Sequence, residues 1–368
     1  MLESEVHSML AVMEEPEPTE DSLARCARQV LFAAAQSDHD QRQAALDRLA
    51  RVFENYGGAK AGYLSVICGA LVEHGCDPAP LASPLFLRIQ DILPKAIELC
   101  QRCESRSSEY HTGDATTATS DSQFKTVLER RSDEFPDLAA AWTDLDRFGP
   151  ATVAVLSTSS QWRAMAHCFQ QPLQQIMHRH QAARWIARLL AVIDDGQLLV
   201  IEPATLSGWP ARISGVADNF QLQTLLMGTT TDNGLDASSA LSSSALDVAR
   251  GIGPQQSPEE VVGRWNFYSW QALQPDLQLP TEPDSAGQKH KILDAGLPAE
   301  IPLFAGHHVL LLGPRTSPHC WASQRSFGHL KASLDCEPAL DPESCREWLN
   351  RMLQRSRPDG ETGSDSCR

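Results

Sequence analysis

The sequence predicts an α+β protein, in which a helical N-terminal bundle is followed by a small mixed sheet flanked by helices. Up to about residue 193, apolar residues recur at the spacing of amphipathic helices. From residue 197 onward, short apolar runs bounded by Gly, Pro or Asp replace that period. The change falls within residues 198–222, where an apolar run ends in Glu202 and Pro203 and a Gly/Pro turn leads into an amphipathic helix.

The N-terminal half is expected to begin with a flexible acidic segment over residues 1–22, because residues 11–21 combine acidic side chains with two prolines. A helical bundle is predicted over residues 23–104, and its short connections favour antiparallel neighbours. Pro94 is expected to kink or split the last of these helices. No sequence repeat of fixed period is present. The four helical patterns lie at residues 23–31, 45–56, 63–71 and 85–97.

The C-terminal half is expected to form an α+β domain over residues 123–354. A linker rich in Ser, Thr and Gly is predicted before it, at residues 105–122, which places the domain boundary near residue 110. Helical patterns over residues 124–193 are expected to cover one face of the sheet. Residues 355–368 are predicted to be a disordered tail. Strands are predicted at residues 198–201, 261–270, 309–312 and 330–336, with a final helix after residue 341.

The charge balance favours a soluble protein without nucleic-acid or membrane partners. The chain carries 31 basic and 47 acidic residues, a formal net charge of −16, which repels phosphate backbones and anionic lipid. No apolar run reaches the roughly 18 residues of a membrane span, and the N-terminus lacks the features of a secretory signal. Several of the ten cysteines lie on apolar helix faces, which favours reduced thiols and a cytoplasmic location.

The first candidate site consists of Glu202, Asp218 and Asn219. Glu202 ends a strand, and the Asp-Asn pair enters a helix, so the three polar side chains could converge on a ligand. The alternative is local: Glu202 precedes a turn, and Asp218 and Asn219 cap the helix.

Arg315 and Trp265 are further candidates for ligand binding. Arg315 follows a central strand and could bind an anion, although Pro314 lacks a backbone donor and a structural turn is the alternative. Trp265 could line a pocket or fill the core. No metal or cofactor site is predicted, because the adjacent His307 and His308 point to opposite faces of a strand. Cys100 and Cys103 have CxxC spacing, but buried thiols on a helix face explain them.

The C-terminal half resembles an uncharacterised bacterial protein family. The resemblance is carried by the blocks VADNFQ at residues 216–221 and VLLLGP at residues 309–314, and it covers about residues 138–353. It implies a shared fold and no assigned activity, cofactor or catalytic residue.

Two functional hypotheses follow from these observations. The first is a non-enzymatic interaction or scaffold protein, whose helical N-terminal half contacts a protein partner. The alternative is an enzyme or small-molecule binder with a site at the strand ends near Glu202, Asp218 and Arg315. The absence of the common catalytic motifs favours the first hypothesis, and the sequence leaves the oligomeric state and the presence of an enzymatic activity open.

Overall fold

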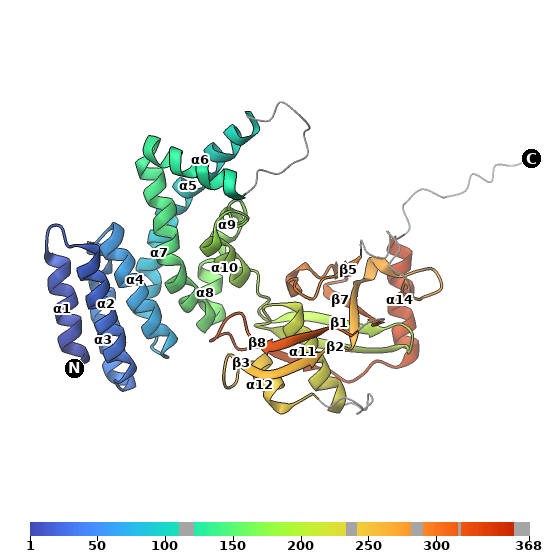
Figure 1. Cartoon of the computed structure of the whole chain (residues 1–368). Helices are drawn as coiled ribbons and strands as arrows, with labels where there is room; N and C mark the ends of the chain where they lie inside the picture. The colour runs from blue at the N-terminus through green and yellow to red at the C-terminus, as the bar shows by residue number, and fades with distance from the viewer. Residues whose placement is uncertain (110–120, 233–240, 281–289, 316–317, 357–368) are drawn as a thin grey trace, which may run out of the picture. The chain divides into compact units, whose positions relative to one another are not determined.

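The computed structural model describes residues 1–109, 121–232, 241–280, 290–315 and 318–356. Contacts divide the chain into two compact units, unit 1 at Met1–Leu190 and unit 2 at Ala191–Arg368. Unit 1 is helical, and unit 2 contains a mixed sheet with helices (Figure 1). The predicted α+β class is therefore confirmed. In the described part of the chain, no helix combines the length and apolarity needed to cross a bilayer.

Unit 1 is built from helices whose starts follow from local capping. Thr19 Oγ1 accepts a hydrogen bond from the Ser22 amide, and Asp38 Oδ1 accepts one from the Gln41 amide. The helices are α1 (Leu2–Glu14), α2 (Glu20–Ala35), α3 (His39–Val52), α4 (Gly58–Glu73), α5 (Ala79–Glu109), α6 (Asp121–Glu134), α7 (Pro136–Thr158), α8 (Ser160–Met165), α9 (Gln170–Gln174) and α10 (Gln181–Leu190), with 3-10 turns η1 (Phe53–Asn55) and η2 (His167–Phe169). Pro94 lies inside α5 and does not split it.

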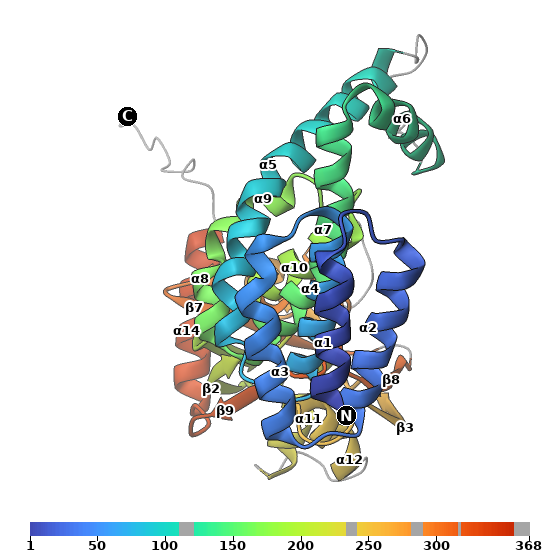
Figure 2. The same cartoon turned by 90° about the vertical axis from the view of Figure 1, so that its left-hand side faces the viewer.

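The expectation of a flexible segment over residues 1–22 is wrong. Helix α1 packs on α2 and α3, and Figure 2 shows the three side by side. Its apolar residues recur at helical spacing and are buried, namely Leu2, Val6, Met9 and Met13. The acidic side chains between them face solvent, so a high acidic content does not prevent a buried apolar stripe.

The helices between residues 124 and 193 belong to unit 1, which corrects the expectation that they cover the sheet. Helix α7 packs on α4 and α5, and α10 packs on α7. Phe53 and Phe148 meet edge to face with ring centroids 5.9 Å apart. The polar stretch expected as a linker over 105–122 therefore joins helices of one unit, and the division falls after Leu190. Residues 110–120 of that stretch lie outside the described residues.

Unit 2 contains a main mixed sheet and a two-stranded sheet. The main sheet has the order β5-β4-β7-β1-β2-β9, with β6 paired to β7, and the small sheet pairs β3 with β8. Among the strand pairs that the structure describes, only β1 and β7 are parallel. The strands are β1 (Gly196–Glu202), β2 (Ser207–Ser214), β3 (Gln256–Val262), β4 (Trp265–Ser269), β5 (Lys291–Ile292), β6 (Leu303–Phe304), β7 (His307–Pro314), β8 (Cys320–Gln324) and β9 (Ser333–Cys336).

Helices cover both faces of the main sheet. Leu198 and Val200 of β1 face a core shared with α11 and α12, whereas Leu199 and Ile201 face a core shared with α14. β7 is apolar on both faces and lies inside the sheet, as its sequence predicts. The helices are α11 (Asn219–Asp232), α12 (Ser243–Arg250) and α14 (Pro342–Ser356), with 3-10 turns η4 (Trp270–Ala272) and η5 (Pro298–Glu300).

Two predicted strands differ from the observed ones. The run 261–270 is divided at Gly263 between β3 and β4, which belong to different sheets. A Cβ atom at Gly263 would lie 2.7 Å from the Trp321 ring, so the backbone between the two sheets passes too close to this ring for a larger residue. The run 330–336 forms a strand only from Ser333 onward. The tail expected over 355–368 lies outside the described residues after residue 356.

Candidate functional site

Asp218 caps the start of α11. Gly215 precedes it with φ +69°, and a Cβ there would overlap the Lys331 carbonyl oxygen, so this turn requires glycine. Asp218 Oδ1 accepts a hydrogen bond from the Gln221 amide at 2.9 Å, and Oδ2 accepts one from Ser326 Oγ at 3.2 Å. One carboxylate oxygen therefore caps α11, and the other connects the start of this helix to Ser326.

Asn219 fastens α11 to the segment that follows β5. Its side chain is buried, and Nδ2 donates to the Leu293 carbonyl at 2.8 Å. Its backbone amide donates to the Gly296 carbonyl at 3.0 Å. The Oδ1 atom is buried and has no hydrogen-bond partner among the described residues. Among the predicted site residues, Asn219 is therefore the one whose buried acceptor atom has no hydrogen-bond partner in the described part of the chain.

Arg315 belongs to a polar network that we call the Asp294 cluster, formed by Gln223, Asp294, Arg315 and His319. The Arg315 guanidinium donates to Asp294 Oδ2 at 2.7 Å, and the pair is largely buried, with 10% and 14% of the two side chains exposed. His319 Nδ1 lies 2.8 Å from the same oxygen. Gln223 Nε2 donates to Asp294 Oδ1 at 3.5 Å. One carboxylate therefore joins three segments of the chain.

Trp265 meets the Asp294 cluster through its backbone. Its carbonyl oxygen accepts from Arg315 Nε at 2.8 Å, and its amide donates to Gln223 Oε1 at 3.3 Å. The indole itself is buried in the core between the sheet and α11. The interpretation of Trp265 as a core residue is therefore the one that the structure supports. Phe220 and Trp321 pack beside His319, with centroid distances of 5.9 and 6.0 Å.

Glu202 does not join the other candidates. It ends β1, and its Oε2 atom accepts from Thr205 Oγ1 at 2.8 Å within the turn to β2. Within the described residues it shares no hydrogen bond or ion pair with the Asp294 cluster. The structure thus brings Asn219, Trp265 and Arg315 near one network and leaves Glu202 in a local turn.

Gln223 and Asp294 are the residues of this network that the sequence did not identify, and His319 follows Arg315 four residues later in the sequence. Gln223 is buried on α11 at a position where the helical period predicts an apolar residue. That buried polar position is the one available signal, because Asp294 and His319 lie in segments without periodicity. A pocket of about 250 Å³ is lined by residues that include Ser269, Lys291, Leu293 and Glu300.

The network is suited to holding segments together rather than to moving protons. The Asp294 carboxylate accepts from Arg315, His319 and Gln223, so its charge is compensated internally. The histidines considered for a metal do not converge: His308 Nδ1 lies 2.7 Å from the Ile301 carbonyl, and His307 packs on Trp348.

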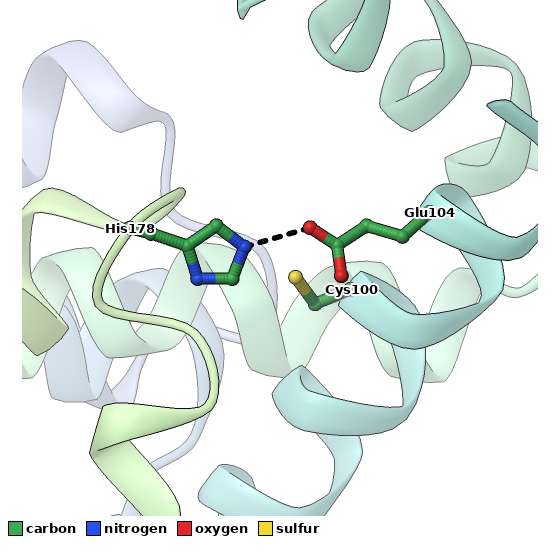
Figure 3. Close-up of side chains that lie close together, drawn as sticks. All are labelled: Cys100, Glu104 and His178. Carbon is green, nitrogen blue, oxygen red and sulfur yellow. Dashed lines mark hydrogen bonds and ion pairs between the residues drawn. The ribbon is translucent and has the colours of Figure 1, made fainter. Parts of the chain in front are cut away.

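Within the described residues, one set of three side chains could hold a metal ion, and it lies in unit 1. Its members are Cys100, Glu104 and His178 (Figure 3). No family model, curated protein or solved structure matches the chain.

Proposed function

We propose that the protein is a non-enzymatic interaction protein and that α2 of unit 1 carries part of its contact surface. The observation behind the proposal is Phe32, whose side chain is 66% exposed on α2. Aromatic side chains, phenylalanine included, are enriched at protein interfaces, where they fill pockets of the partner. Leu87 of α5 is likewise exposed, at 59%.

The charge around this helix suggests the chemistry of the partner. Residues 1–22, which form α1 and the start of α2, contain no lysine or arginine. Their acidic residues are Glu3, Glu5, Glu14, Glu15, Glu17, Glu20 and Asp21. A surface of this charge attracts a basic partner and raises its association rate. Arg25 and Arg28 are also exposed on α2, and Arg28 lies one turn before Phe32. The proposed partner is therefore a protein with an apolar pocket for Phe32 and with basic groups that face α1 and the start of α2.

The candidate residues of unit 2 also support a binding role over catalysis. Asp218 caps a helix, Glu202 bonds to a turn threonine, and Asp294 is paired with Arg315. Each carboxylate is already engaged by protein donors, whereas a general acid or base needs access to substrate. Buried, unpaired thiols such as Cys68 fit a reducing compartment, so the proposed location is the cytoplasm.

A photo-cross-linking amino acid at position 32 tests the proposal in extract from the producing organism. The expected result is one covalent adduct with a basic protein, whose identity mass spectrometry gives. Binding of that purified protein should weaken at least about tenfold in Phe32→Ser, the scale of an interface anchor. Gln29→Ser is the matched control, because Gln29 is an exposed residue of the same helix. Equal affinity of both variants, or the absence of an adduct, would reject the proposal.

The alternative function is a small-molecule binder or enzyme with its site at the start of α11. The buried, unpartnered Oδ1 atom of Asn219 is the observation that favours it. A thermal-shift screen of small polar metabolites should then yield a stabilising ligand, and Asp218→Ala should abolish that shift without loss of fold. Unchanged ligand binding in Asp218→Ala, or no stabilising ligand, would count against the alternative.

A further inference from the structure

Three side chains with metal-binding atoms converge in unit 1, away from the residues discussed above. Cys100 and Glu104 lie one turn apart on α5, and His178 lies between α9 and α10. The cysteine sulfur, a carboxylate oxygen and an imidazole nitrogen all lie within 4.8 Å of one another. Figure 3 shows the His178 ring pointing at Glu104, with the Cys100 sulfur beside them. The Nε2 atom of His178 is 2.7 Å from Glu104 Oε1.

We propose that Cys100, Glu104 and His178 bind a divalent transition-metal ion, and that zinc is the ion their chemistry fits best. Thiolate, imidazole and carboxylate are the three ligand types that zinc accepts in proteins. Bond lengths of about 2.0–2.3 Å in a tetrahedral site place ligand atoms roughly 3.5 Å apart. The observed spread of up to 4.8 Å therefore closes with side-chain shifts of about 1 Å.

The positions of the three residues along the chain suit this site. Cys100 and Glu104 are separated by four residues on a helix, so both side chains project from one face. His178 comes from a separate segment and completes the set from across the site. Three protein ligands leave a fourth position for water or a ligand, as in catalytic rather than structural zinc sites.

The surroundings also suit a metal ion that can enter the site from solution and leave it again. Cys100 is buried, Glu104 is half-buried and His178 is about half exposed, so the site runs from the interior to the surface. His178 also lines a pocket of about 350 Å³ together with Phe124, Arg184 and Trp185. Arg179 Nε lies 3.4 Å from Glu104 Oε1 and can orient that carboxylate as an outer-sphere group.

A nucleophilic cysteine is the competing explanation for the same three residues. A Cys-His-Glu set could activate a thiol if the imidazole took its proton. Reactive cysteines are partly exposed and have a lowered pKa. Cys100 is instead buried, with 1% of its surface exposed. Burial therefore counts against a nucleophilic Cys100, and the metal proposal rests on the convergence of the three ligand atoms.

Metal titration of the full-length chain tests the proposal. Protein freed of metal with a chelator should bind one zinc ion per chain in calorimetry. Cobalt(II) should give a thiolate-to-cobalt charge-transfer band in the near ultraviolet. Both signals should be lost, or the affinity reduced at least 100-fold, in His178→Ala and in Cys100→Ser. His178 is a surface residue, so His178→Ala is expected to keep the fold, which circular dichroism checks.

Cys103→Ser is the matched control, because Cys103 is a buried cysteine one turn from Cys100 on the same helix. It should retain the zinc affinity and the cobalt spectrum. Absence of zinc binding in the wild type would overturn the proposal, as would zinc binding that survives in His178→Ala. Equal loss in Cys103→Ser would overturn the assignment of these three ligands. Alkylation of Cys100 by iodoacetamide in the native, metal-free protein would favour the nucleophilic alternative and count against the metal site.

Discussion

Replacement of Gly69 by alanine tests how closely α4 and α7 pack. A Cβ atom at this position would lie 2.8 Å from the Cα atom of Ala151 and 3.1 Å from its Cβ atom. Ordinary carbon–carbon contacts are about 3.5–4.0 Å, so the two helices would have to separate by roughly 1 Å. The obstacle is the backbone of α7, which no rotamer change can remove. Insertion of a methyl group into such a contact costs about 1–3 kcal/mol.

Gly62 provides the matched comparison within the same helix. A Cβ atom at Gly62 meets the side chain of Arg147, at 2.7 Å from Cδ and 3.1 Å from Cβ. The partly exposed outer part of that side chain can move, and the contact with Cβ requires a shift of only a few tenths of an ångström. Both substitutions gain up to about 1 kcal/mol of helix propensity, because alanine restricts the unfolded chain more than glycine does. We therefore expect Gly62→Ala to be neutral or stabilising, and Gly69→Ala to be less stable than it by about 1–3 kcal/mol.

Urea unfolding followed by far-ultraviolet circular dichroism measures this difference, since most of the helical signal comes from unit 1. The reasoning fails if Gly69→Ala is as stable as Gly62→Ala. Such a result would mean that α7 does not approach α4 at this point. The assignment of the helices after residue 123 to unit 1 would then lose one of the close contacts between α4 and α7 that support it.

Further expectations concern the Asp294 cluster, the thiols and the last helix. Asp294→Asn or Arg315→Met should each destabilise the protein by about 3 kcal/mol, because the remaining charged group stays buried without its ion-pair partner; in a double-mutant cycle the combined loss should be smaller than the sum, and additive losses would contradict the ion pair. Among the nine described cysteines, Ellman's reagent should label Cys168 and Cys320 in the native protein and the buried ones only after denaturation, whereas disulfides would contradict this. Hydrogen bonds from the backbone amide and the hydroxyl of Ser344 lower the pKa of Asp341. The contribution of this carboxylate to stability is therefore present above the unfolded pKa of about 3.9 and is lost as pH falls through the folded pKa. A stability difference between the wild type and Asp341→Asn that stays constant below about pH 4 would contradict this.

The fold class could be predicted because secondary structure leaves a local signal. The apolar run 309–312 has no polar face, which is typical of a strand buried on both sides, and β7 has this position. Helical periods near residues 23, 45, 63 and 85 fall within α2, α3, α4 and α5. Each of these signals depends on neighbouring residues only, so it survives without knowledge of the tertiary structure.

The division into units was not predictable in the same way. The polar stretch over 105–122 has the composition of a linker, yet it connects two helices that pack together in unit 1. Composition reports that a segment lacks a core of its own, but it does not report which elements its two ends join. The acidic N-terminus shows the converse, since α1 has four buried apolar residues among its charges. In this segment the spacing of the apolar residues predicts the helix, whereas the acidic composition alone predicts a flexible segment.

The candidate sites show why chemistry is harder to predict than secondary structure. The helix cap at Asp218 is a local interaction and was one of the two interpretations that its sequence position allowed. The Cys100 set is different, because His178 lies 74 residues from Glu104 and only the fold brings them together. The sequence shows two of the three residues, a cysteine and a glutamate four residues apart on a helix, and such pairs occur by chance. The convergence of a third ligand from another segment is what turns this pair into a metal-site hypothesis, and it depends on the packing of the α9–α10 segment against α5.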